Sequence, residues 1–117
     1  MNFRSDLLTI TLIAAAVLLP GNSRANSIYR YTYHGGPEYE SLAALGVNLG
    51  LDDLIAICKS NEMCNYLGMD TVSLGATLAW AMECFEKGVL TLDDTGGVPL
   101  NFHDADGVVK LVEMIAY

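Results

Sequence analysis

Positive charge is scarce in this sequence: 6 Lys and Arg residues stand against 14 Asp and Glu among 117 residues, for a net charge of −8 at neutral pH. A chain this acidic repels phosphate backbones, which argues against nucleic-acid binding through a basic surface. Long hydrophobic runs are missing as well. The apolar stretch from Leu7 to Leu19 has 13 residues, whereas a helix needs about 20 to cross a bilayer. The sequence therefore predicts no membrane span.

Cysteine and histidine are also few. The three cysteines, Cys58, Cys64 and Cys84, are separated by 6 and 20 residues, which fits neither a disulfide framework nor the paired C-x-x-C spacing of zinc and iron–sulfur sites. Free cysteines of this kind are mostly buried and behave as small apolar side chains. His34 and His103 are isolated, and we interpret them as a strand-end and a helix-start residue. No metal site is predicted.

A length of 117 residues is enough for one domain. Residues 1–25 form a signal-like apolar segment, with Arg4 near the start and Ser23-Arg24-Ala25 as a small-x-small cleavage site. Asp6 departs from this pattern, because the start of a signal peptide is cleanly positive. The segment is either a cleaved signal or packs on another part of a protein. We favour a cytoplasmic protein, with export as the alternative, and place the domain at residues 26–117.

The pattern of the rest predicts a mainly α fold, a bundle-like helical fragment with one short N-terminal strand and a small hairpin. The strand is expected at residues 27–34, where three tyrosines alternate with polar residues. The hairpin is expected from residues 89–92 and 98–102, with Pro99 restricting it to a sheet edge.

Four helices are predicted from their caps and stops. A short one covers residues 38–45 and closes near Gly46 or Gly50. The next opens after Asp52 as N-cap and ends at Leu67, before a left-handed Gly68. The others are residues 71–87, capped by Asp70 and followed by Gly88, and a final helix opened by Asp104.

The helix at residues 71–87 is apolar nearly all round. Its apolar positions include Val72, Leu78, Trp80 and Phe85, and only a few polar residues are left for water. A helix of this composition is usually buried on several sides. It therefore fits the central helix of a layered bundle. Within this chain alone it would have too few partners, and we expect it to expose an apolar patch.

Two strings, Gly36–Glu40 and Asn61–Gly75, carry a resemblance to a known family. They are similar to the tungsten-pterin aldehyde ferredoxin oxidoreductases, and the likeness extends over about residues 35–117. The resemblance implies the helical second domain of these enzymes. In the family, this domain walls one side of a site that holds a bis-pterin with tungsten or molybdenum, beside a [4Fe–4S] cluster.

The family's pterin-binding motif, D-x-x-G-(L/I)-(C/D), has a counterpart at Asn65-x-x-Gly68-Met69-Asp70. The resemblance implies that Asn65, Gly68, Met69 and Asp70 bind the cofactor, although asparagine replaces the first aspartate and removes its charge. Independently of the family, Gly68 frees the turn between two helices, and the backbone N–H groups that start the next helix face outward. Without the resemblance, Asp70 reads simply as an N-cap.

Glu40 matches a family glutamate that lies close to the metal and is thought to assist proton transfer. The resemblance makes it the candidate catalytic residue. Such a role requires a partly dry pocket, in which the pKa of a carboxyl group rises toward the working pH. The alternative is an exposed glutamate that interacts with the dipole at the start of a helix.

The sequence departs from the family in its missing parts. The family's cluster cysteines, C-x2-C-x3-C just before this stretch, have no counterpart here. The family often has a metal-binding glutamate at its dimer interface, and the residue nearest to that position in this sequence is Lys59. The first pterin-binding domain and the third domain are also absent. The chain alone is therefore expected to bind neither tungsten, nor pterin, nor a cluster.

Three functions remain open. The chain is a partial aldehyde ferredoxin oxidoreductase-like protein, inactive alone, whose parent reaction oxidises an aldehyde to a carboxylic acid and passes electrons to ferredoxin. Alternatively, it is a small exported helical binding protein without catalysis, or a separate subunit completed by other chains. Neighbouring reading frames that encode the missing cysteines and third domain would favour the first.

Overall fold

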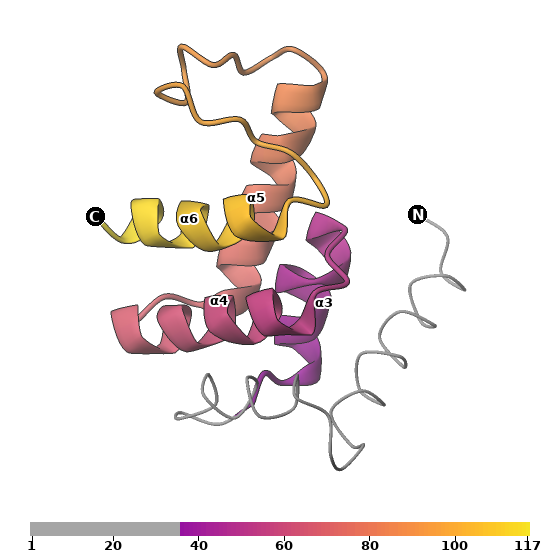
Figure 1. The fold of residues 1–117 in the computed structure, drawn as a ribbon, viewed down its shortest axis with the longest axis vertical. Coiled ribbons are helices and arrows are strands. Elements are labelled where there is room, and N and C mark those ends of the chain that lie inside the picture. Colours follow the sequence, from indigo (N-terminus) through magenta and orange to yellow (C-terminus); the bar gives the residue numbers. More distant parts are fainter. Residues whose placement is uncertain (1–35) are drawn as a thin grey trace.

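The structure, a computed structural model, describes residues 36–117 (Figure 1). These residues form four α-helices and one short 3-10 helix, with no strand among them: α3 (Tyr39–Leu45), η1 (Val47–Leu49), α4 (Leu54–Leu67), α5 (Thr71–Glu86) and α6 (Ala105–Ala116). The predicted mainly α fold is confirmed for this part of the chain. The strand expected at residues 27–34 lies outside the described residues.

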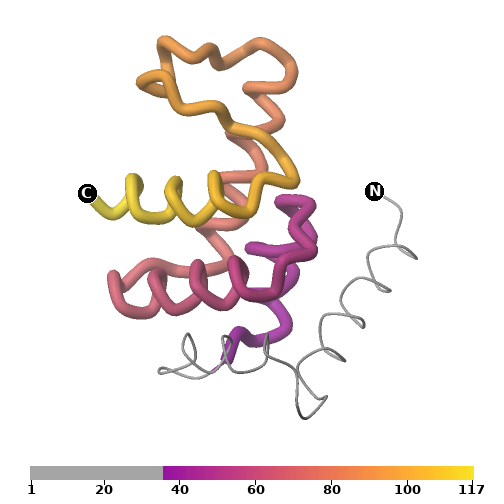
Figure 2. The backbone as a smooth tube through the Cα atoms, in the orientation of Figure 1, coloured from indigo at the N-terminus to yellow at the C-terminus, as the bar shows by residue number. Residues whose placement is uncertain are grey.

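The helices pack as two pairs. Helix α3 lies against α5, and α4 lies against α6, while η1 sits between α3 and α5. In Figure 1, α4 and α6 lie one above the other and α5 crosses behind them. The C-terminal half of α5 extends beyond α6, and Figure 2 shows residues 87–104 looping back along this end of the molecule.

One apolar core joins the two pairs. Its fully buried side chains come from every helix of the described residues, and the largest are Leu45, Leu49, Ile57, Met82, Val108 and Val112. Helix α6 contributes a narrow stripe at three- and four-residue spacing, with Val108, Leu111 and Val112 buried, whereas Ile115, the fourth residue of the stripe that the sequence predicts, is exposed. The buried positions of α5 thus lie between Leu74 and Met82, and Phe85 near its end packs against the core only in part.

The helix ends have the predicted capping residues, with one correction. Gly68 has a φ of 72° and ends α4, and Asp70 and Asp104 cap α5 and α6 through side-chain bonds to backbone N–H groups. The N-cap of α4 is Asp53, not Asp52: its Oδ1 accepts from Ile55 N at 2.9 Å and Ala56 N at 3.2 Å. The prediction was wrong by one residue because two successive aspartates compete for the same role.

The predicted hairpin is not formed. Residues 91–100 follow a series of turns instead of two paired strands. The Asp94 carboxylate accepts from Thr91 N at 2.8 Å and from Thr91 Oγ1 at 2.7 Å, so it binds a backbone donor that a ladder would need. Gly96 and Gly97 both adopt positive φ, which extends the turn, and Pro99 has no N–H to donate.

Helix α5 does not have the several buried sides of a central helix among the described residues, which confirms the expectation that this chain supplies too few partners for it. Its buried positions are Leu74, Gly75, Leu78 and Met82, which lie on one face. Trp80 is 64% exposed and Val72 is 45% exposed. Helix α5 is therefore half covered, although its sequence is apolar all round.

Candidate functional site

The four motif residues lie at the corner where α4 turns into α5. Asn65 is exposed on the last turn of α4, and Gly68 forms the left-handed stop. The backbone N–H of Met69 donates to the Cys64 carbonyl oxygen at 2.8 Å, which closes the turn. A Cβ on Gly68 would meet no atom within 4 Å. The corner is thus open to approach from outside the described part of the chain.

Asp70 is an N-cap with a defined charge state. Its Oδ2 accepts from Ser73 N at 2.7 Å. Hydrogen bonds from the side chain and the backbone of Ser73 hold the pKa of the Asp70 carboxyl below its ordinary value of 3.8. At neutral pH this exposed carboxylate is an anion that can only accept hydrogen bonds. Such a group suits a ligand that presents N–H donors.

Glu40 lies in the first turn of α3, next to the same corner. The neighbouring Ser41 Oγ is 2.7 Å from Thr71 Oγ1, which follows Asp70 at the start of α5. This side-chain bond ties the first turns of α3 and α5 together. The structure therefore brings Glu40 and Asp70, 30 residues apart in the sequence, to adjoining helix starts.

A close helix crossing fixes this arrangement. A Cβ added to Gly75 would lie 2.5 Å from the backbone carbon of Ala44 and would also collide with its carbonyl oxygen. Only glycine at position 75 lets the backbone of α5 rest on that of α3. The Ser41–Thr71 bond and the Gly75–Ala44 contact together determine how the two helix starts face each other.

Glu40 is exposed in the described residues. The dry pocket that a general base needs is therefore not formed by residues 36–117. The catalytic role of Glu40 stays a prediction.

The cysteines are buried to different extents. Burial raises the pKa of the Cys58 thiol to about 11, and burial followed by the negative charge of Asp70 raises that of Cys64 to about 11. Both thiols are therefore protonated at neutral pH. Cys84 is half-buried. Among residues 36–117, no group of three or more His, Cys, Asp and Glu side chains is placed to hold a metal ion.

His103 has a structural role, as predicted for a helix-start histidine. Its Nδ1 donates to the Gly50 carbonyl oxygen at 2.7 Å, and its backbone N–H donates to the Leu49 carbonyl oxygen at 3.0 Å. Its φ is +64°. The residue fastens the chain that returns from α5 onto the turn after η1. His34 lies outside the described residues.

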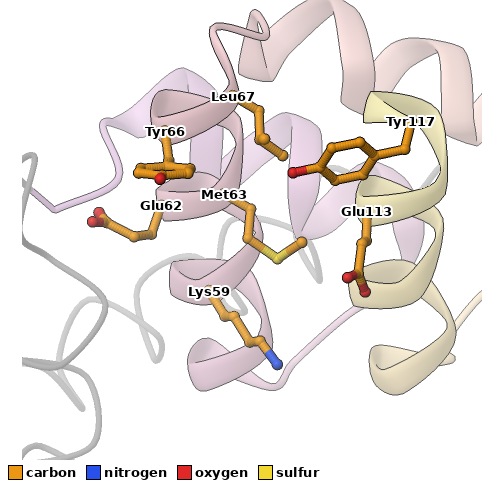
Figure 3. A pocket seen from close by; sticks show the side chains of 7 residues that line it. All are labelled: Lys59, Glu62, Met63, Tyr66, Leu67, Glu113 and Tyr117. Atoms are coloured by element: carbon orange, nitrogen blue, oxygen red, sulfur yellow. The ribbon is translucent and has the colours of Figure 1, made fainter.

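A groove between α4 and α6 was not predicted from the sequence. This groove, of about 320 Å³, is lined mainly by apolar surface. Figure 3 shows its lining residues, from the outer face of α4 and the end of α6: Lys59, Glu62, Met63, Tyr66, Leu67, Glu113 and Tyr117. The lining residues of α4 recur at three- and four-residue spacing. This spacing predicts that they share one face of the helix, but it does not predict that a groove separates this face from α6.

Comparisons with known proteins found a matching family and several relatives. The family described as "Aldehyde ferredoxin oxidoreductase, domains 2 & 3" matches residues 19–117. The "Tungsten-containing aldehyde ferredoxin oxidoreductase" of Thermococcus kodakarensis is 44% identical over 98 residues, which are 83% of this chain and 16% of the relative. Its namesake in Pyrococcus furiosus is 48% identical over 79 residues, 68% of this chain and 13% of the relative.

A more distant relative has a different name. The "Aliphatic sulfonate oxidoreductase, WOR-like subunit" of Pyrococcus furiosus is 32% identical over 87 residues, which are 74% of this chain and 14% of that protein. No solved structure matches. No helix within residues 36–117 has the length and hydropathy to cross a membrane.

The matched segment of the chain thus corresponds to 13–16% of the length of these relatives. The family match begins at residue 19, before the stretch that carries the resemblance in sequence. The family match over residues 19–117 and the relatives of 44% and 48% identity show that the chain belongs to the aldehyde ferredoxin oxidoreductase family.

Proposed function

We propose that this chain forms part of the wall of a tungsten–pterin site in an aldehyde ferredoxin oxidoreductase-like enzyme whose other domains come from elsewhere. The observation that carries the proposal is the joined start of α3 and α5: Ser41 and Thr71 bond at 2.7 Å, next to Glu40 and Asp70. In this arrangement the candidate catalytic residue and the pterin motif flank one surface.

The residues of the corner fit a pterin. The Asp70 carboxylate accepts hydrogen bonds from ring N–H groups, and the Asn65 amide both donates and accepts. Gly68 leaves open space beside the turn, so a flat ring can approach the backbone. Met69 packs partly against the core and anchors the turn. When bound, the metal–pterin group supplies the redox chemistry of the family.

The parent reaction converts an aldehyde and water into a carboxylic acid, two protons and two electrons. In the family, the electrons would pass to ferredoxin by way of the cluster. Glu40 would take up a proton at its carboxylate during this oxidation, once other domains exclude water from the pocket. The cluster cysteines, the remaining pterin contacts and the ferredoxin surface belong to those other domains or subunits. We place the assembled protein in the cytoplasm.

The test is purification of the tagged full chain from its own cells without oxygen. Pterin is measured as its fluorescent oxidation product, and tungsten by elemental mass spectrometry. We expect both to copurify, and Asp70→Asn to lower the pterin content because it removes the charge while keeping an acceptor for the cap. Asp52→Asn, which changes an exposed carboxylate before α4, is the matched control.

Absence of pterin from the wild-type preparation, or equal loss in both variants, would contradict the proposal. If the chain were instead recovered from an exported fraction without pterin, the small binding protein without catalysis would be the better interpretation.

A further inference from the structure

Helix α5 has one face that nothing in the described residues covers. At 100° per residue, Val72, Ala76, Trp80 and Glu83 fall within one quadrant of the helix, opposite the buried Leu78 and Met82. All four are exposed. We name these four residues the open face of α5.

The open face is apolar for most of its length. No charged residue occurs from Thr71 to Met82, and Trp80, the only tryptophan of the chain, is 64% exposed. From Val72 to Trp80 the strip extends about 12 Å, at 1.5 Å of rise per residue. Tryptophan contributes strongly to protein interfaces because its ring buries a large area with little loss of conformational freedom.

Beyond Trp80 the surface becomes acidic. Lys87 pairs with Glu83, whereas Glu86, Asp93 and Asp94 add negative charge at the same end of the molecule. A partner that covers both regions must offer an apolar recess for the indole and basic side chains beside it. Carboxylates brought together from two copies would repel each other, which argues against self-association through this face.

The open face also continues the candidate site. Val72 follows the Asp70 corner by two residues, on the exposed side of the same helix. A partner that completes the pocket around Glu40 and Asp70 can therefore extend along α5. The relatives supply the identity of this partner, because the matched segment makes up only 13–16% of their length.

We propose that the open face of α5 is the docking surface for another part of an aldehyde ferredoxin oxidoreductase-like enzyme, which receives Trp80 in an apolar recess with a basic rim. This inference rests on the proposed function for the identity of the partner. It adds which face of the chain meets that partner and the chemistry of the surface that covers it.

The experiment places a photo-crosslinking benzoylphenylalanine at position 80 of the full chain. The matched control carries it at position 66, because Tyr66 is also aromatic and is 77% exposed, but lies on α4 beside the groove of Figure 3. Both proteins are first checked for helical circular dichroism. They are then irradiated in a soluble extract of the protein's own cells, and crosslinked peptides are identified by mass spectrometry.

We expect position 80 to crosslink to a polypeptide of this enzyme family, at a peptide that contains Lys or Arg, and several times more than position 66 does. Added Trp80-containing chain should compete, and the Trp80→Ala variant should compete less well. Crosslinking to a second copy of the chain, or no crosslink at position 80, would overturn the inference.

The two proposals fail in different ways. If position 66 captured the family polypeptide and position 80 did not, the docking surface would be wrong while the proposed function stood. If pterin were absent from the purified protein but position 80 still captured the family polypeptide, the docking surface would stand and the cofactor-wall proposal would fall.

Discussion

At the scale of single residues, Gly75 does the most to position the candidate site. Its missing side chain lets α5 touch the backbone of α3 at Ala44, and this contact sets the distance between the helix starts that carry Glu40 and Asp70. The sequence marks Gly75 as an unusual residue within a helix, but it does not show which backbone approaches it. That partner is 31 positions away and emerges only from the folded arrangement.

We predict that Gly75→Ala destabilises the protein by about 1–3 kcal/mol, the usual cost of forcing extra atoms into a packed contact. Alanine favours a helix interior by about 1 kcal/mol over glycine, so a net loss requires that the collision with Ala44 outweighs this gain. Urea unfolding followed by circular dichroism measures the effect.

The control for this variant is Gly36→Ala, because a Cβ there meets no atom within 4 Å. Its free energy of unfolding should stay within about 0.5 kcal/mol of wild type. Gly75→Ala of wild-type stability or better would show that α3 and α5 are not in close contact.

Asp70 gives the protein a pH-dependent helix start. The pKa of the Asp70 carboxyl in the folded protein lies below the ordinary 3.8. The stabilisation of the fold by the ionised cap is therefore fully present above pH 3.8 and is lost as the pH falls through the folded pKa. We predict that Asp70→Asn lacks this component and shows a flatter decline of the urea midpoint between about pH 5 and pH 2. Parallel profiles for the two proteins would refute the assigned pKa shift.

The three cysteines are predicted to differ in reactivity. Cys58 and Cys64 are buried with pKa values near 11, whereas Cys84 is half-buried. An aromatic disulfide reagent at pH 8 should therefore label one thiol per chain quickly and the other two only after denaturant is added. A Cys84→Ser variant should lose the fast reaction, and fast labelling of a second thiol in that variant would contradict the assigned burial.

At the scale of elements, prediction succeeded where a few adjacent residues decide the structure. Gly68 and Asp70 fix the end of α4 and the start of α5 by local capping, and the structure confirms both. The prediction of the hairpin was wrong for an equally local reason. The Asp94 carboxylate accepts a hydrogen bond from the Thr91 backbone, and a turn forms where strand pairing was expected. The groove between α4 and α6 is different, since it depends on how two helices 37 residues apart lie together.

The returning segment between α5 and α6 depends on His103. The ring of His103 donates to Gly50 at 2.7 Å, and a Cβ on Gly50 would lie 2.5 Å from the ring carbon Cε1. Glycine at position 50 thus lets the imidazole approach. This contact ties the turns after α5 to the turn after η1.

We predict that His103→Asn lowers stability by about 1 kcal/mol, the net value of one hydrogen bond, and makes residues 87–104 more sensitive to proteolysis. Asparagine tolerates the left-handed backbone of this position, so the loss reports on the ring. Limited proteolysis with mass spectrometry locates the cleavage. Unchanged proteolysis of this segment would mean that the ring does not fasten it.

At the scale of the whole molecule, the sequence predicted the class of fold, the family and the incomplete covering of α5 within this chain, but not which protein covers the rest of the helix. Helix α5 is apolar because it needs contacts on more than one side, and the described residues supply them on one. Residue patterns show how much burial a helix requires, whereas they do not show which protein provides it. The exposed Trp80 and the open setting of Glu40 are two results of the same incomplete covering.

The N-terminal segment is predicted to remain part of the protein. A signal peptidase acting after Ala25 would leave a chain that starts at Asn26, and it would remove the seven residues from 19 to 25 that the family match includes. Asp6 also departs from the positive start that export signals need. We therefore predict that mass spectrometry of the protein from its own cells finds residues 19–25 retained. A species beginning at Asn26 in an exported fraction would contradict this prediction and favour the small binding protein without catalysis.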